Sequence, residues 1–363
     1  MSTTIYFIGA GAIARSHAEA VELLPNADEI ELAAADPTPA ARKRFAEAVD
    51  DVRLYEDSES MLSEAVDPDD FVVVAAPPFT HHDETIAALE SGRHVLCEKP
   101  LAPALDEAEA MLKAARENDR LLGSCNCRHY RTPGTERVKQ LIDEGAIGDP
   151  YHVTWITRSQ RGRPGIEYQP ESKWFLDRSK GGGGIVMDWG PYEFATLEDL
   201  LVPDSVDVKH AWTAQPETAV DPEDIPFDVE THGGATLVYR TDERDVQVTY
   251  ERASGTHGEE RDVTEIEGTE GAIRWDWTEV GTSTVTLATD NDGDLVEESI
   301  AVTPDEDIEA HDRPLVYFDR VVRGGDAPIR TGAEAITSVA MINAMYRCAE
   351  SGEPQRVDLS KIA

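Results

Sequence analysis

Ile5-Tyr6-Phe7-Ile8-Gly9-Ala10-Gly11-Ala12-Ile13-Ala14 is the stretch that decides the fold of this chain. An apolar run stops at a Gly-x-Gly-x-x-Ala turn, and a polar-faced helix follows. Gly9 permits a tight turn, Gly11 lets the backbone approach a pyrophosphate, and Ala14 lets the helix pack close to the strand. The helix start at Ala12 and Ile13 would present free N–H groups and a positive dipole end to phosphates. The stretch therefore predicts a dinucleotide-binding strand–turn–helix.

The next apolar strand, Ile30 to Ala35, ends at Asp36. A carboxylate there is placed to accept hydrogen bonds from the adenosine ribose hydroxyls. An ordinary strand-to-helix turn would explain the glycines but not this acid. The carboxylate would also repel a 2′-phosphate, and no arginine follows at once, since Arg42 comes a helical turn later. We therefore expect NAD as the cofactor, with NADP the weaker candidate.

The chain has 363 residues, enough for two domains, and a formal charge of −39. Its 72 acids are spread along the sequence without a block, and hydrophobic residues make up 40% of it, so an acidic disordered protein is not expected. Lysine is scarce, with 8 lysines against 25 arginines. Such a surface is typical of halophiles, in which molar salt screens self-repulsion. An acidic surface for basic partners would predict a local patch, and nucleic-acid binding is not expected.

The cysteines are Cys97, Cys125, Cys127 and Cys348, with no Cys-x-x-Cys pair. Cys125, Cys127 and His129 could share one face of a strand, which raises a metal site as an alternative. Their spacing is not that of a zinc knuckle, so we expect buried thiols and no metal. The sequence shows no signal peptide and no long apolar run, so we expect a soluble cytoplasmic protein that does not bind membranes.

Alternating strands and helices fill residues 4–125. The expected strands are 4–8, 29–35, 71–75, 93–97 and 120–125, and helices are expected at 80–91, with Thr80 as a cap, and at 104–117. Continuous apolar runs such as Phe71 to Ala75 are typical of a parallel sheet covered on both faces. This predicts a doubly wound Rossmann domain over residues 1–124.

Later residues change to alternating polar and apolar runs. Strands are expected at 151–157, 206–214, 233–240, 245–252, 261–268, 271–277, 283–289 and 295–302. Two helices, about 306–323 and 332–349, close the chain. The fold class is therefore α/β, with an α+β second domain over 125–363 that holds a large, mostly antiparallel open sheet.

Two loops follow buried strands of the first domain, where ligands of open parallel sheets bind. Glu98-Lys99-Pro100 follows one strand, and in a chain this poor in lysine we expect Lys99 at the cofactor edge rather than in a solvated loop. Ala76-Pro77-Pro78-Phe79-Thr80-His81 follows the other. Pro77, Pro78 and Phe79 could line the nicotinamide pocket, and we expect Ala76, Pro77 and His81 among the cofactor contacts. His81 is expected to hold the helix start rather than act as a base.

The third chemical element runs from Gly181 to Tyr192 and contains four glycines, then Asp188 and Tyr192. The glycines would permit close backbone approach, to a substrate or to the nicotinamide. If Asp188 lies at a helix start, residues four apart share one face, and the carboxylate and the phenol point into one pocket. The alternative is a purely structural role, with Asp188 as an N-cap and Tyr192 as a core residue.

With these elements the chain resembles the glucose–fructose oxidoreductase/inositol dehydrogenase family, also called the Gfo/Idh/MocA family. The resemblance covers nearly the whole length, and the Glu98-Lys99-Pro100 loop and the glycine run before Asp-x-Gly-x-Tyr are its most specific parts. The other matching residues are Gly9-Ala10-Gly11, Ala76-Pro77 with His81, Asn126 with Arg128, and Gly145 to Gly148. Inositol dehydrogenases usually have histidine where this chain has Tyr192, which is similar to the aldose-oxidising branch. The N-terminal arm and export leader of glucose–fructose oxidoreductase are not seen, so a permanently buried cofactor and a periplasmic location are not implied.

The resemblance implies a dehydrogenase of sugars or polyols, and the residues fit that chemistry. A free tyrosine has a pKa of about 10, and an ammonium beside it would favour the phenolate. Lys99 could supply that charge and also stabilise a developing alkoxide, while Asp188 orients the substrate or Lys99. Polar and aromatic side chains suited to a sugar are Arg128, His129, Tyr130, Lys173 and Trp174. Glu98 completes the expected cofactor contacts.

Two other functions stay open at this stage. One is a glycosidase that uses bound NAD as a transient oxidant, which would turn over aryl glycosides without net NADH. The other is a non-catalytic dinucleotide-sensing protein, which the joint presence of Lys99, Asp188 and Tyr192 disfavours. By analogy with the family, we expect a homo-oligomer that assembles through the second sheet.

Overall fold

The computed structural model describes residues 3–241 and 244–362. The chain forms two compact units, one up to Arg128 together with Ile308–Ile336, the other His129–Asp307 together with the chain from Thr337 on. The sequence-based domain limits, 1–124 and 125–363, stay a prediction. The units differ from those limits in two respects, since the first boundary lies after Arg128 and a late segment of the chain, Ile308–Ile336, belongs to the first unit.

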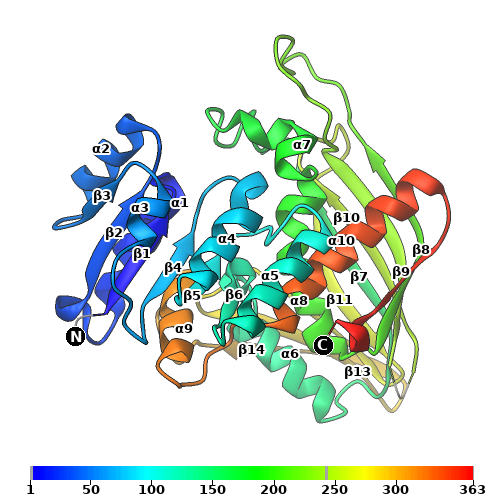
Figure 1. The fold of residues 1–363 in the computed structure, drawn as a ribbon. Helices are drawn as coiled ribbons and strands as arrows, with labels where there is room; N and C mark the ends of the chain where they lie inside the picture. The colour runs from blue at the N-terminus through cyan, green and yellow to red at the C-terminus, as the bar shows by residue number, and fades with distance from the viewer. Residues whose placement is uncertain (1–2, 242–243, 363) are drawn as a thin grey trace. The chain divides into compact units, whose positions relative to one another are not determined.

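A parallel six-stranded sheet forms the centre of the first unit (Figure 1). Its strands are β1 (Thr4–Ile8), β2 (Glu31–Ala35), β3 (Arg53–Tyr55), β4 (Phe71–Val74), β5 (His94–Cys97) and β6 (Leu122–Ser124). Their order is β3-β2-β1-β4-β5-β6, and every pair runs parallel. All residues of β1 and β4 are buried, as their continuous apolar runs require. The predicted Rossmann sheet is confirmed, with a topological switch point between β1 and β4.

The helices of the first unit are α1 (Ala12–Glu19), α2 (Pro39–Ala48), α3 (Ser58–Leu62), α4 (His81–Glu90), α5 (Leu105–Glu117) and α9 (Arg313–Val322). Asp57 caps α3 by accepting the N–H of Ser60. The predicted cap of α4 is wrong, because the Thr80 hydroxyl instead donates to Pro77 O at 2.9 Å.

Helix α9 (orange in Figure 1) packs on the parallel sheet although it lies far along the chain. Its Phe318 meets the Phe71 ring edge-on, with centroids 5.3 Å apart. A Cβ on Gly123 would lie 2.7 Å from the same ring. The sequence assigns this helix to the second domain, because sequence order gives no sign that an apolar helix face is used by an earlier sheet.

A nine-stranded sheet forms the second unit. Its strands are β7 (Pro150–Arg158), β8 (Ser205–Ala214), β9 (His232–Arg240), β10 (Val246–Ala253), β11 (Arg261–Gly268), β12 (Gly271–Trp275), β13 (Ser283–Asn291), β14 (Asp294–Val302) and β15 (Gln355–Asp358). They lie in the order β14-β13-β12-β11-β7-β10-β9-β8-β15. The β7–β10 pair is parallel and the other described pairs are antiparallel, as predicted for a mostly antiparallel sheet.

The α-helices of this unit are α6 (Pro133–Asp143), the four-residue α7 (Arg178–Gly181), α8 (Ile185–Leu201) and the part of α10 (Ala333–Ser351) from Thr337 on. Helix α8 packs against β9 and β10, and α6 against β12, β13 and β14. Short 3₁₀ helices are η1 (Ala20–Leu23), η2 (Ala27–Glu29), η3 (Pro78–Thr80), η4 (Cys125–Arg128), η5 (Lys173–Leu176) and η6 (Leu359–Lys361). Across the described residues, no helix combines the length and the apolar character needed to cross a membrane.

Candidate functional site

Gly9, the first glycine of the turn after β1, holds a conformation that other residues rarely adopt. Its φ is +94° and its N–H donates to Ala35 O at 2.8 Å. A Cβ on Gly9 would lie 2.7 Å from Ala75 O. Glycine is therefore required here by the packing of the protein itself.

Gly11 is a glycine for a different reason. Its φ of −74° suits any residue, and an added Cβ would meet no described atom within 4 Å. Gly11 and Ala12 are exposed and Ile13 is half-buried, and the N-cap residue, Gly11, has no side chain that could cap α1. The first N–H groups of an α-helix lack partners within the helix. Open space beside such groups fits the phosphates of a dinucleotide.

The carboxylate of Asp36, which follows β2, braces the glycine turn. Its Oδ2 accepts from Ala10 N at 2.9 Å and its Oδ1 accepts from Thr38 N at 2.8 Å. The guanidinium of Arg42 donates to the main-chain oxygen of Asp36 at 2.5 Å. Because an ionised carboxylate offers about four acceptor sites, ribose hydroxyls can still bind it.

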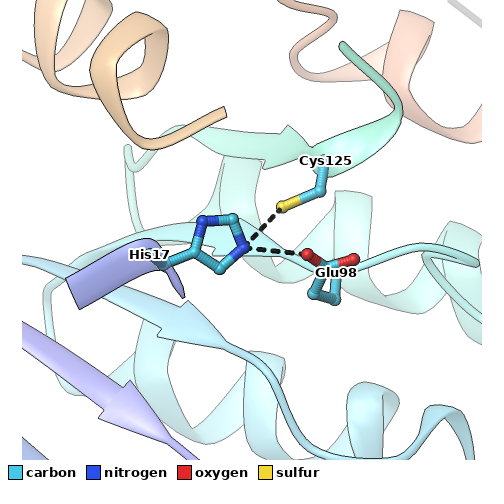
Figure 2. Close-up of side chains that lie close together, drawn as sticks. All are labelled: His17, Glu98 and Cys125. Carbon is cyan, nitrogen blue, oxygen red and sulfur yellow. Dashed lines mark hydrogen bonds and ion pairs between the residues drawn. The ribbon is translucent and has the colours of Figure 1, made fainter. Parts of the chain in front are cut away.

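Glu98, which follows β5, belongs to a buried ionic cluster, and Figure 2 shows it beside His17 and Cys125. Its Oε1 accepts from His17 Nε2 at 2.8 Å and from Arg128 Nη2 at 2.9 Å. Its Oε2 accepts the N–H of Lys99 at 3.0 Å. Burial would raise the pKa of Glu98, but the positive charges of Arg128, His17 and Lys99 outweigh it and hold that pKa well below its usual range. The carboxylate therefore fixes the backbone from which Lys99 projects.

Cys125 completes this cluster, with its Sγ 3.9 Å from His17 Nε2. His17, Glu98 and Cys125 together could hold a metal ion. Two features argue against it, since Arg128 already occupies Glu98 Oε1 and burial raises the pKa of the Cys125 thiol well above its usual value. The alternative trio with Cys127 and His129 does not share a strand face, because residues Cys125–Arg128 form η4. The absence of a resident metal stays a prediction.

His81 ties together the loops after β4 and β5. Its Nδ1 lies 2.9 Å from Pro100 O and its Nε2 lies 2.8 Å from Ala76 O. The side chain is buried, and burial lowers its pKa. Ala76 and Pro77 are half-buried beside it. His81 thus sets the shape of the loops expected to line the nicotinamide.

In the second unit, Asp188 lies in the first turn of α8 and Tyr192 in the next. Both side chains are buried, Asp188 at 9% exposure and Tyr192 at 3%. Tyr192 meets His129 edge-on with ring centroids 5.2 Å apart, and Trp189 at 5.7 Å. The arrangement brings a carboxylate and a phenol to one helix face, within an aromatic wall.

Glu193, the residue after Tyr192, joins α8 to the sheet. Its carboxylate accepts from Trp155 Nε1 at 3.3 Å, from Tyr250 OH at 2.5 Å and from Arg252 Nη1 at 3.1 Å. The guanidinium of Arg252 also lies 3.9 Å from the Trp189 ring centroid. Burial raises the pKa of Glu193 despite Arg252. These bonds therefore anchor α8, and with it Tyr192 and Trp189, to the sheet.

Two other predicted sugar contacts, Lys173 and Trp174, have partners elsewhere in the second unit. Lys173 is exposed and donates to Gly165 O at 2.8 Å, and Trp174 stacks on Phe175 at 3.8 Å. The glycine run does not lie open to a ligand at two of its positions. A Cβ on Gly183 would lie 2.1 Å from Tyr346 OH, and one on Gly184 would lie 1.8 Å from Glu230 O.

The predicted cofactor residues share one edge of the parallel sheet, since each follows the carboxyl end of a strand. These are Gly9, Gly11, Ala12 and Ile13 after β1, Asp36 after β2, Ala76, Pro77 and His81 after β4, and Glu98 and Lys99 after β5. Arg128, predicted as a substrate contact, follows β6 in the same unit. Asp188, Tyr192, Lys173 and Trp174 belong to the second unit. That Lys99 and Tyr192 meet at one substrate stays a prediction.

Sequence reasoning missed three residues that the structure brings to these sites. His17 could have been noticed as a histidine on the apolar side of the first helix. Glu193 and Glu230 gave no signal, because their partners come from distant segments.

Comparisons with known proteins agree with this geometry. Residues 3–124 match a family model described as an oxidoreductase family with an NAD-binding Rossmann fold, and residues 135–274 match the GFO/IDH/MocA C-terminal domain. The 1,5-anhydro-D-fructose reductase of Ensifer adhaerens is 28% identical, covering 80% of this chain and 81% of its own. The D-xylose 1-dehydrogenase [NADP(+)] of Haloarcula marismortui is 27% identical, with 81% and 76% covered.

The myo-inositol 2-dehydrogenase of Thermotoga maritima is 26% identical, with 90% of each chain covered. Among solved structures, a levoglucosan dehydrogenase in complex with NADH and L-sorbose superposes with a TM-score of 0.78 at 21% identity. That match covers 99% of this chain and 100% of the other, which shows a shared fold. This chain belongs to the Gfo/Idh/MocA oxidoreductase family, with an NAD-binding Rossmann fold in its N-terminal part.

Proposed function

We propose that this protein is an NAD-dependent dehydrogenase that oxidises a hydroxyl of a sugar or polyol. The observation that carries the proposal is the pair of Asp188 and Tyr192, buried one turn apart on α8. The glycine turn and Asp36 support the cofactor half. The named activities of relatives support the substrate class, since they act on an anhydro sugar, an aldose and an inositol.

The proposed roles follow from what each side chain can do. When bound, the nicotinamide accepts the hydride that leaves the substrate carbon. Tyr192 takes the hydroxyl proton, and the Lys99 ammonium favours the phenolate that can do so. Lys99 also stabilises the alkoxide that develops on the substrate oxygen. Asp188 orients the substrate or Lys99, and Arg128, Lys173 and Trp174 stay candidates for sugar contacts.

NAD is the cofactor we propose, on the charge of Asp36. A 2′-phosphate would meet that carboxylate. The NADP-dependent xylose dehydrogenase among the relatives makes this preference a matter for direct measurement. We also keep the tyrosine-containing, aldose-oxidising branch as the proposed subgroup, on Tyr192.

The test is a panel of aldoses, inositols and sugar acids with NAD or NADP in high potassium chloride, followed at the NADH absorbance. We expect net NADH with at least one free sugar. Turnover of an aryl glycoside without net NADH would replace the proposal with the glycosidase mechanism.

Three variants test the roles of the residues. Lys99→Met and Tyr192→Phe should each lower kcat by about 10²- to 10⁴-fold while NADH still binds. Lys113→Met is the control, because Lys113 is exposed and pairs with Glu117 at 3.7 Å. If both active-site variants kept full activity, the proposed function would fail.

A halophilic origin and a homo-oligomer assembled through the second sheet are also proposed. With a formal charge of −39, the folded protein should lose thermal stability when salt is removed. Equal Tm values in dilute buffer and high potassium chloride would contradict the first proposal, and a monomeric mass by light scattering would contradict the second.

A further inference from the structure

Glu230 accepts hydrogen bonds from three consecutive backbone N–H groups at the start of helix α8. Its Oε2 accepts from Gly184 N at 2.9 Å and its Oε1 accepts from Val186 N at 3.1 Å. The N–H between them, on Ile185, donates to the main-chain oxygen of Glu230 at 3.1 Å. Groups that a helix N-terminus normally leaves without partners are therefore satisfied by one residue from the approach to β9.

A second helix locks this carboxylate in place. Tyr346, on α10, donates its hydroxyl to Glu230 Oε1 at 2.8 Å. The Tyr346 ring lies under the guanidinium of Arg178, 5.3 Å from its centroid. Since Glu230 is half-buried and three donors, two backbone N–H groups and the Tyr346 hydroxyl, bind its carboxylate, it has little freedom to move.

The last two glycines of the run are explained by these contacts. A Cβ at Gly184 would lie 1.8 Å from Glu230 O, and one at Gly183 would lie 2.1 Å from the Tyr346 hydroxyl. Any larger residue at these positions would push α8 away from Glu230. The glycines therefore let the helix seat on the protein itself.

The position of the helix start matters because α8 lacks one of its own backbone hydrogen bonds close to Asp188 and Tyr192. Pro191 lies inside α8 and has no N–H to donate to the preceding turn. Since a helix turns about 100° per residue, a small rotation at its start redirects both side chains. Glu193 holds the helix from its middle onward, and Glu230 holds the turn that carries Asp188.

We propose that Glu230 is a positioning residue, which sets the rotation and depth of the first turn of α8 and so directs Asp188 and Tyr192 at the substrate. This inference rests on the proposed function for the two α8 residues. It adds a residue that touches neither substrate nor cofactor and acts through the helix.

Glu230→Gln tests the proposal, because it keeps the size of the side chain but replaces one acceptor oxygen of the carboxylate with an NH₂ group, which can only donate. We expect amide hydrogen exchange of a peptide spanning residues 183–192 to quicken by about tenfold or more. With NAD and the best sugar of the panel, kcat should fall by about 10²-fold, as for a small misplacement of reacting groups. The Kd for NADH should stay within about twofold of wild type.

Glu198→Gln is the matched control, because Glu198 is a buried carboxylate on α8 itself, ten residues after Asp188. It should leave exchange at residues 183–192 and kcat unchanged. Should Glu230→Gln fail to fold, Tyr346→Phe removes one donor to Glu230 and leaves the amide contacts. It should then produce a smaller change in the same two measurements.

Wild-type exchange and kcat in Glu230→Gln, or in Tyr346→Phe if only that variant folds, would overturn the inference. Its failure is separable from that of the proposed function. An inactive Tyr192→Phe beside a fully active Glu230→Gln removes only the positioning role, whereas a fully active Tyr192→Phe removes the proposed function itself.

Discussion

Two glycine-rich turns, Gly9–Gly11 and Gly181–Gly184, each lead into a helix, and the structure uses them in opposite ways. The N-cap of α1 is Gly11, which has no side chain to cap the helix, and a side chain added there would enter open space. The start of α8 is filled by Glu230, and a side chain at Gly184 would strike its main chain.

The contrast teaches that a glycine run before a helix does not by itself mark a ligand. At α1 the helix N–H groups are left for an anion from outside the chain. At α8 a carboxylate of the protein takes that place and supplies the negative charge that the helix dipole favours. We therefore assign the first turn to cofactor binding in the proposed function, and the second to the positioning role proposed for Glu230.

Gly184→Ala should have the largest effect on stability, and it tests the contact between Glu230 and the start of α8. The new Cβ would lie 1.8 Å from a main-chain oxygen that cannot rotate away. We expect a loss of stability of about 3 kcal/mol, measured by denaturant unfolding at constant salt.

Gly258→Ala is its control, an exposed glycine whose Cβ would meet only Thr256 Oγ1 at an ordinary 3.5 Å. Equal stability of the two variants would contradict the idea that the run exists to seat α8.

Gly11→Ala should show the reverse pattern. With no described atom within 4 Å of the new Cβ, stability should stay within about 0.5 kcal/mol of wild type. The Kd for NADH should rise by about 10²-fold, because the methyl group takes the space of a phosphate. Calorimetric titration with NADH checks this, and unchanged affinity would mean that the turn is not the phosphate site.

Asp36→Ser combined with Thr38→Arg sharpens the cofactor side of the comparison. Removing the carboxylate and adding a cation should raise the ratio of kcat/KM for NADP over NAD by about tenfold or more. Because Asp36 also accepts from Ala10 N, binding of both cofactors should weaken. Asp36→Asn serves as control, since it removes the charge but keeps an acceptor oxygen. An unchanged ratio would refute the assignment to NAD.

The buried carboxylate of Glu98 and the half-buried carboxylate of Glu230 should give small pH effects of opposite sign on stability. The pKa of Glu98 is held low in the folded state, so its contribution is complete above the unfolded value of about 4.3 and is lost as pH falls below it. Burial raises the pKa of Glu230, so its contribution declines as pH rises from about 4.3 to its folded value.

Unfolding free energies of wild type, Glu98→Gln and Glu230→Gln across acid pH test these signs. The advantage of wild type over Glu98→Gln should grow with pH, and its advantage over Glu230→Gln should shrink, each by about 1 kcal/mol. Parallel curves for the two variants would show that the folded environments do not differ as described.

Much of the fold could be predicted because its signals are local. Gly9 marks a turn that needs a positive φ, and the apolar runs of β1 and β4 mark buried strands. The short strands β3 and β15 escaped prediction, because edge strands of three or four residues carry little pattern. The return of α9 to the first sheet was missed for another reason, since no local signal says which sheet a helix will cover.

The candidate site divides in the same way. Its residue types and their places after strands were readable from sequence, including Lys99 after β5 and Asp188 in the first turn of a helix. The hydrogen-bond partner of each polar group could not be predicted from the sequence. Asp36 braces its own turn, and Glu98 joins His17 from a helix 81 residues earlier.

The sequence by itself determined the dinucleotide turn, the two sheets and the kind of chemistry, because turn geometry, strand burial and side-chain type depend on neighbouring residues. Only the tertiary structure decided which helix start is open and which is filled. Glu230 reaches Gly184 across 46 residues of chain, and a partner at that distance is chosen by the packing of the whole unit rather than by any local pattern.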